Sequence, residues 1–370
     1  MKKFLPIVMC YVLAAVGAKA QNDTICDLKG EKAVVDGLNY LIDKETHEAI
    51  VDNGNSWTGE LSIPSEVTVG GETYIVTWLA WMAFDGCETL TKVTIPKTVK
   101  GIASVSINAE AYKNPFNRCT ALEDIDVEEG CEGFCSIGGA MFTRDKTMLC
   151  SYPAGNKADS YVVPEGVKRI GGTSFAYNEH IVSVELPETV EMIDDAFTYC
   201  NKLERVNLPE KITSICAFTF RYCSHLKSIV IPQGVRSIGE YTFEGCSSLK
   251  VIDLPASLTF IGGYAFKGCA LEALVIRGII DNYLSGGALS GLDESTVLYV
   301  QESEINRYKA IFHGTVLPLE SYQEPYYAVQ SMTIPATGAS QGIYDLQGRC
   351  LKTAPTRGIY IQNGKKRISH

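Results

Sequence analysis

Apolar residues recur along the middle of the chain with a fixed period of 23 residues. The repeat is marked by a phenylalanine followed three residues later by a cysteine, as in Phe197 and Cys200, Phe220 and Cys223, Phe243 and Cys246, and Phe266 and Cys269. Self-similarity at a period of about 20 to 50 residues is typical of stacked repeat architectures. The pattern therefore predicts a solenoid in which each unit forms one coil.

The same signature appears less regularly nearer the N-terminus. It recurs as Phe84 with Cys87 and as Phe116 with Cys119, and then as Phe175 with Asn178 in the cysteine position. Between Phe116 and Phe175 the spacing is too long for one unit. Residues 123–159 are therefore interpreted as an irregular insert, which contains a predicted hairpin with strands at 140–143 and 147–152.

Within a unit, the order of residue types predicts the local structure. Val184-Glu185-Leu186 alternates apolar and polar side chains, which predicts a short strand with one buried face. Pro187 ends this strand because proline cannot donate to a sheet ladder. The following Ala-Phe-x-x-Cys-x-x-Leu segment has near-helical spacing and predicts a short helical turn. Each unit exposes an apolar edge, so stability comes from stacking on its neighbours and the ends need caps.

Several short motifs carry a family resemblance across residues 49–322, among them Ile95-Pro96, Ser237-Ile238-Gly239 and Ala265-Phe266-Lys267-Gly268-Cys269. This text resembles the BspA-like, Treponema-type leucine-rich repeat family of bacterial surface proteins. The resemblance implies a leucine-rich repeat solenoid of short β-strands and short helical turns, with about 23 residues per unit. It also implies an N-terminal capping region at 21–60, repeats at 61–276 and a C-terminal cap at 277–322.

Both ends of the chain carry features that predict export. Lys2 and Lys3 precede the apolar stretch 4–18, and Ala18-Lys19-Ala20 offers a cleavage site, so residues 1–20 are predicted to be a signal peptide. Beyond a linker at 323–330, residues 331–370 resemble the C-terminal sorting or anchoring tails of Bacteroidetes exported proteins. We expect this tail to form a small β unit. No second apolar run is long enough to predict a membrane-spanning helix.

Composition narrows the partners. The chain is 46% hydrophobic, which is enough for a real core, and its 33 basic and 43 acidic residues give a net charge of −10. The charge is uneven, because residues 21–330 carry −18 and residues 331–370 carry +5. An acidic body argues against a nucleic-acid partner. Because no catalytic, cofactor or phosphate-binding motif occurs in the sequence, we expect no cofactor and no enzymatic activity.

Six of the 13 cysteines, Cys87, Cys119, Cys200, Cys223, Cys246 and Cys269, belong to the repeat. Stacked coils keep their Cβ atoms about 4.8 Å apart, whereas a disulfide prefers about 3.8 Å. These cysteines are therefore predicted to be buried, free thiols beside the phenylalanine ladder. Cys131 and Cys135 lie in the insert and form a candidate disulfide. The sequence holds no second pair at ligand spacing, so no metal site is predicted.

A tyrosine precedes the cysteine position in three successive units, as Tyr177, Tyr199 and Tyr222, with Arg221 beside the last. Tyrosine offers a large contact area at a low entropic cost, so these residues are a candidate platform for a glycan or a peptide. The alternative is a half-buried ladder that only stabilises adjacent coils.

The sequence therefore predicts an exported, adhesin-like scaffold that binds a protein or a glycan. The alternative is a structural component of the cell envelope that binds another bacterial protein. Thr24 lies within Asp23-Thr24-Ile25, which resembles an O-glycosylation motif of Bacteroidetes exported proteins. The sequence predicts no particular oligomeric state.

Overall fold

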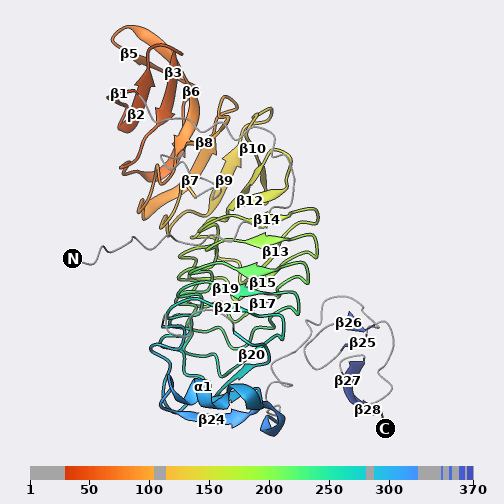
Figure 1. Cartoon of the computed structure of the whole chain (residues 1–370). Helices are drawn as coiled ribbons and strands as arrows, with labels where there is room; N and C mark the ends of the chain where they lie inside the picture. Colours follow the sequence, from red (N-terminus) through yellow and green to blue (C-terminus); the bar gives the residue numbers. More distant parts are fainter. Residues whose placement is uncertain are drawn as a thin grey trace, which may run out of the picture.

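The computed structural model describes residues 30–103, 114–280 and 287–323, together with the strands of the C-terminal tail. Stacked coils form a solenoid, which runs from the N-terminal strands to helix α1 (Ile305–Lys309) at the other end (Figure 1). The predicted signal peptide, Thr24 and most of the predicted linker lie outside the described residues.

Each coil has two sides made of short strands that pair with the neighbouring coils, mostly in parallel. The first side holds the strands that precede the repeat proline or its equivalent: β4 (Thr58–Ser62), β7 (Thr89–Ile95), β9 (Asp124–Val127), β13 (Ser160–Val162), β15 (Ser183–Glu185), β17 (Arg205–Val206), β20 (Val251–Leu254), β22 (Ala273–Ile276), β23 (Val297–Val300) and β24 (Thr315–Pro318). The second side holds β3 (Glu48–Val51), β6 (Glu72–Ala80), β8 (Gly101–Ala103), β12 (Met148–Ser151), β14 (Arg169–Ile170), β16 (Met192–Ile193), β18 (Ser214–Ile215), β19 (Ser237–Ile238) and β21 (Phe260–Ile261).

The third side of the coil, which we call the turn side, differs from the sequence prediction. The predicted short helical turn consists instead of two consecutive turns, in which Cys200 N–H donates to Phe197 O (3.0 Å) and Leu203 N–H donates to Cys200 O (3.1 Å). A helix cannot continue because Tyr199 has a left-handed φ of 61°. The amides of Phe197 and Tyr199 instead donate to the next coil. The turn side therefore also carries a ladder of hydrogen bonds between coils.

The ends of the solenoid are built differently from its coils. At the N-terminal end, β1 (Glu31–Val35), β2 and β3 pair in antiparallel fashion, where β2 is Leu38–Asp43, and β5 (Glu66–Val69) pairs antiparallel with β6. At the other end lie β24, α1 and the 3-10 turns Glu302–Glu304 and Leu319–Ser321. The tail forms the short strands predicted for it: β25 (Ile343–Tyr344), β26 (Cys350–Leu351), β27 (Gly358–Gln362) and β28 (Lys365–Ser369) in one antiparallel sheet.

The insert joins two hydrophobic cores. The predicted hairpin is confirmed as β11 (Ala140–Thr143) and β12, with β10 (Phe134–Ile137) added on the outer edge. Phe142 and Leu149 pack into the C-terminal core, whereas Met141 and Met148 pack into the N-terminal one. Because successive side chains of a strand point to opposite faces, one hairpin closes both cores.

Phenylalanine rings stack from coil to coil along the core. The centroids of Phe175 and Phe197 lie 5.0 Å apart, and those of Phe197 and Phe220 lie 5.4 Å apart with nearly parallel planes. The column continues through Phe243 and Phe266, and Phe84 stacks on Phe116 in the N-terminal part. All seven rings are buried, as the repeat pattern predicts.

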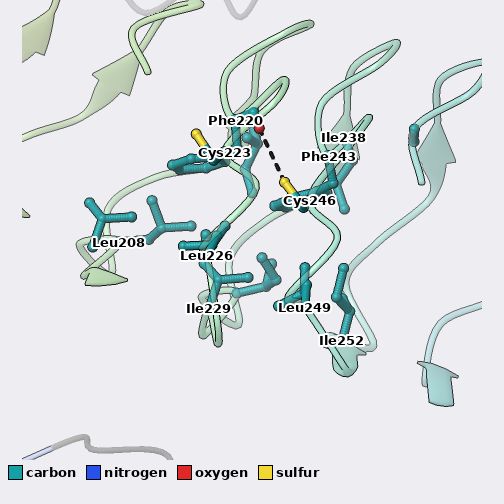
Figure 2. Close-up of a cluster of buried hydrophobic side chains, with 14 of the residues drawn as sticks. Leu208, Phe220, Cys223, Leu226, Ile229, Ile238, Phe243, Cys246, Leu249 and Ile252 are labelled. Atoms are coloured by element: carbon teal, nitrogen blue, oxygen red, sulfur yellow. Dashed lines mark hydrogen bonds between the residues drawn. The ribbon is translucent and has the colours of Figure 1, made fainter. Parts of the chain in front are cut away.

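The repeat cysteines are buried beside these rings and donate hydrogen bonds backwards. Cys246 Sγ lies 3.1 Å from the carbonyl oxygen of Phe220, one coil earlier (Figure 2). The same bond is made by Cys119, Cys200, Cys223 and Cys269, each to the phenylalanine of the preceding unit, and Cys87 donates to Asn55 O. The thiol therefore links coils as well as filling space.

Asn178 shows that this link is what the position requires. Its Nδ2 donates to the carbonyl of Pro153, one coil earlier, at 3.1 Å. Its Oδ1 accepts from the amides of His180 and Ile181. The asparagine thus retains the backward hydrogen bond of the cysteine that it replaces, and its polar atoms are satisfied although it is buried.

Glycine is required where the coils approach most closely on the second side. A Cβ on Gly239 would lie 2.3 Å from Ala217 N, and one on Gly262 would lie 2.4 Å from Glu240 N. Cys216 occupies the equivalent position one coil earlier, and there the parallel sheet is interrupted between β16 and β18. We attribute the interruption to the cysteine side chain, which needs room that a glycine does not.

Gly239→Ala is expected to lower the free energy of unfolding by roughly 1–3 kcal/mol, because the new methyl group meets backbone atoms that cannot move away. Gly234→Ala is the matched control, since its nearest atoms lie 3.6 Å away, and it should change stability by less than about 1 kcal/mol. Chemical denaturation of the two variants checks this expectation. Equal effects would show that the close approach is not what requires glycine.

The repeat thiols are expected to react only after unfolding. Burial raises the pKa of Cys200 to about 12 and raises that of Cys223 well above its ordinary value, so both stay protonated at neutral pH. An alkylating reagent without reductant should therefore leave the ladder unmodified in the native protein and label all six cysteines in denaturant. Ladder peptides that remain blocked in denaturant until a reductant is added would instead reveal disulfides.

Candidate binding face

The three tyrosines predicted from the sequence form one column on the turn side. The rings of Tyr177 and Tyr199 have centroids 4.8 Å apart, and those of Tyr199 and Tyr222 are 4.7 Å apart. The interplanar angles are 13° and 27°, so the rings stack face to face in an offset manner. All three side chains are half-buried. The structure therefore brings the predicted platform residues together.

This stacking decides which part of each ring a ligand can reach. The faces of Tyr199 are covered by its two neighbours, so the ring offers its edge and hydroxyl to solvent. Within the described residues, no hydrogen bond joins the hydroxyls of Tyr177, Tyr199 or Tyr222 to another residue. The column thus presents a row of phenol hydroxyls that are able to donate to and accept from a ligand.

A second aromatic column, which sequence reasoning missed, runs beside the first. Phe218, Tyr241 and Tyr264 occupy the position two residues before the ladder phenylalanine in three successive coils. Their centroids lie 5.5 Å and 5.2 Å apart, with interplanar angles of 6° and 9°. Tyr264 is 41% exposed at the end of this column. The spacing of 23 residues between the three was a signal present in the sequence.

All six residues of the two columns share an unusual backbone conformation. Their φ angles lie between 54° and 63°, in the left-handed region that bulky side chains rarely adopt. Gly245, Gly268 and Gly291 take the first-column position in the coils that follow, with φ angles of 76°, 71° and 77°. Six aromatic residues therefore occupy positions where glycine avoids a cost of about 1–3 kcal/mol each.

A row of charged residues lies between the two columns. Arg221 Nε donates to Glu244 Oε2 at 2.6 Å, and Lys267 Nζ donates to Glu244 Oε1 at 2.9 Å. The guanidinium carbon of Arg221 lies 5.4 Å from the ring centroid of Phe218, 4.9 Å from that of Tyr222 and 5.6 Å from that of Tyr241. Arg221, the fourth predicted residue, thus bridges both columns. We call the two columns together with Arg221, Glu244 and Lys267 the aromatic face.

The charges of this row are set by mutual contact. Burial alone would raise the pKa of Glu244, but hydrogen bonds and charge from Lys267 and Arg221 outweigh it and lower that pKa below its ordinary value. Glu244 is therefore ionised at neutral pH. The row holds two cations and one anion.

The other predicted site residues do not form a second site. Cys131 Sγ donates to Val99 O at 3.2 Å and Cys135 Sγ donates to Thr143 O at 3.5 Å, and both thiols are free, so the structure does not join them. Within the described ranges, no group of three His, Cys, Asp or Glu side chains is arranged to hold a metal ion. No helix in the described part of the chain is long and apolar enough to cross a bilayer.

The coil geometry defines the chain as a leucine-rich repeat solenoid. Residues 74–149 and 150–272, more than half of the sequence, match the model of the BspA type leucine rich repeat region in six copies. The chain therefore belongs to the BspA-type leucine-rich repeat family.

Solved structures with the same fold come from other bacterial proteins. The pneumococcal vaccine antigen PcpA is 18% identical with a TM-score of 0.51, over 78% of this chain and 99% of that one. A leucine-rich repeat protein from Bacteroides ovatus is 24% identical with a TM-score of 0.47, over 77% of this chain and 66% of that one. A leucine rich cell surface protein from Faecalibacterium prausnitzii is 18% identical with a TM-score of 0.42, over 71% and 99%. A search of curated proteins found no match.

Proposed function

We propose that this protein is an exported, non-catalytic scaffold that binds a protein or a glycan through its aromatic face. The observation that carries the proposal is the left-handed backbone of all six aromatic residues. Strain of this kind gathers at functional sites, because selection retains it only where the side chain is needed. Stacking offsets part of the cost, since an aromatic pair contributes about 0.5–1.5 kcal/mol.

Stacking alone does not account for the hydroxyls. Five of the six residues are tyrosines, and their hydroxyls have no hydrogen-bond partner among the described residues. Phenylalanine would stack equally well, as the buried phenylalanine ladder does. A binding role gives these hydroxyls a use, because a preorganised row of donors and acceptors loses little entropy when a ligand docks.

The triple variant Tyr177→Phe, Tyr199→Phe, Tyr222→Phe separates binding from stability. It keeps the stack, so the free energy of unfolding should change by less than about 1 kcal/mol, while affinity for a ligand should fall by about tenfold or more. The matching triple serine variant should lose both. Binding is measured on arrays of purified glycans, host extracellular proteins and bacterial envelope proteins.

Tyr161→Phe is the control, because Tyr161 is a half-buried tyrosine on strand β13, outside the aromatic face. It should leave binding unchanged. If the triple phenylalanine variant binds as well as the parent protein and the serine variant loses only stability, the columns are structural ladders. If the ligand that binds is an envelope protein, the scaffold serves envelope assembly rather than adhesion.

We further propose that residues 1–20 direct export and that residues 331–370 act as a Bacteroidetes-type sorting or anchoring tail. The basic and apolar pattern of residues 1–20 supports the first part. In intact cells that produce the full chain, added protease should degrade the solenoid, and deletion of residues 331–370 should protect it or release it to the medium. Unchanged surface accessibility after the deletion would exclude a sorting role for the tail.

A further inference from the structure

We propose that Arg221 and Lys267 form an anion subsite within the aromatic face, and that the ligand is a largely neutral oligosaccharide carrying one carboxylate or sulfate group. This inference rests on the binding function proposed above and specifies its ligand. It draws on the geometry of the charged row, on the exposure of its members and on the charge of the surrounding body.

From the solvent, the charged row presents two cations and no anion. The side chains of Arg221 and Lys267 are 31% and 49% exposed, whereas that of Glu244 is 4% exposed. The one buried carboxylate binds both cations through its two oxygens, which holds them at a fixed separation. The row therefore has a net charge of +1 and is preorganised to receive an anion.

Arg221 still has donors to offer. Its Nε bonds to Glu244, and no other hydrogen bond from its guanidinium is made to a described residue. Its terminal nitrogens are thus available for the planar contact that guanidinium makes with carboxylate or sulfate oxygens. The three surrounding rings reduce the water around the charge, which strengthens such a contact.

The hydroxyl rows favour a glycan over an acidic peptide. Tyr222, Tyr241 and Tyr264 flank the subsite with ring edges and phenol hydroxyls that have no hydrogen-bond partner within the described residues. Sugars present many hydroxyls and few apolar groups, so they match this surface. The spacing between rings, 4.7 to 5.5 Å, is comparable to the length of one pyranose unit, so successive sugars would meet successive coils.

The charge of the body sets the number of anionic groups. Residues 21–330 carry −18, so a polyanion would be repelled by the surface beyond the subsite. One anionic group on a neutral chain gains the contact with Arg221 and Lys267 without that repulsion. We therefore expect singly charged glycans to bind better than either neutral glycans or polyanions.

The test uses the full chain on an array in which each neutral oligosaccharide is paired with its carboxylated or sulfated counterpart, lactose with sialyllactose and sulfated lactose among them. At least one acidic member should bind about tenfold more tightly than its neutral counterpart, and heparin should bind no better. Lys267→Gln should remove this difference, because Glu244 then keeps only Arg221. Arg221→Gln should do the same.

Lys267→Arg retains the charge and should retain most of the preference for the acidic member. Lys227→Gln is the control, because Lys227 pairs with Glu204 and does not belong to the aromatic face. Equal binding of acidic and neutral members would overturn the anion subsite but leave glycan binding intact. Binding of an acidic peptide and of no glycan would overturn the ligand class. Binding that survives the triple phenylalanine variant would contradict the proposed function itself.

Discussion

The spacing between coils is the constraint on which the rest of the molecule depends. Hydrogen bonds on the strand sides and on the turn side hold equivalent residues about one strand spacing apart, roughly 5 Å. Each side chain therefore lies on its own counterpart in the next coil. Inside, this stacks Phe197 on Phe220 and places each cysteine thiol under a carbonyl. Outside, the same register stacks Tyr199 on Tyr222 and brings Glu244 between two cations.

Much of this arrangement was predictable from the sequence, because a fixed period already states which residues are equivalent. The repeat, the buried phenylalanine column and the hairpin at the insert follow from spacing and alternation alone. The helical turn was predicted wrongly because spacing does not report the sign of φ, and the left-handed Tyr199 ends any helix there. The charged row was not predictable, since the partner of Glu244 depends on side-chain reach across coils rather than on position in the repeat.

Exposed and buried positions of the coil differ in what they demand. A buried position must fill a fixed volume and satisfy a fixed carbonyl, which is why Asn178 succeeds only by donating the same hydrogen bond as cysteine. An exposed position must only tolerate its neighbours above and below. The scaffold therefore stays constant while the turn side varies from coil to coil, and specificity belongs to the combination of several coils rather than to one unit.

The left-handed position on the turn side has a consequence for how such a surface changes over time. The backbone there is the same whether the residue is Tyr222 or Gly245. An exchange between tyrosine and glycine lengthens or shortens the column by one ring without disturbing the coil beneath it. Recognition can thus drift in discrete steps along the axis, and a lineage can retune what it adheres to while its architecture is inherited unaltered.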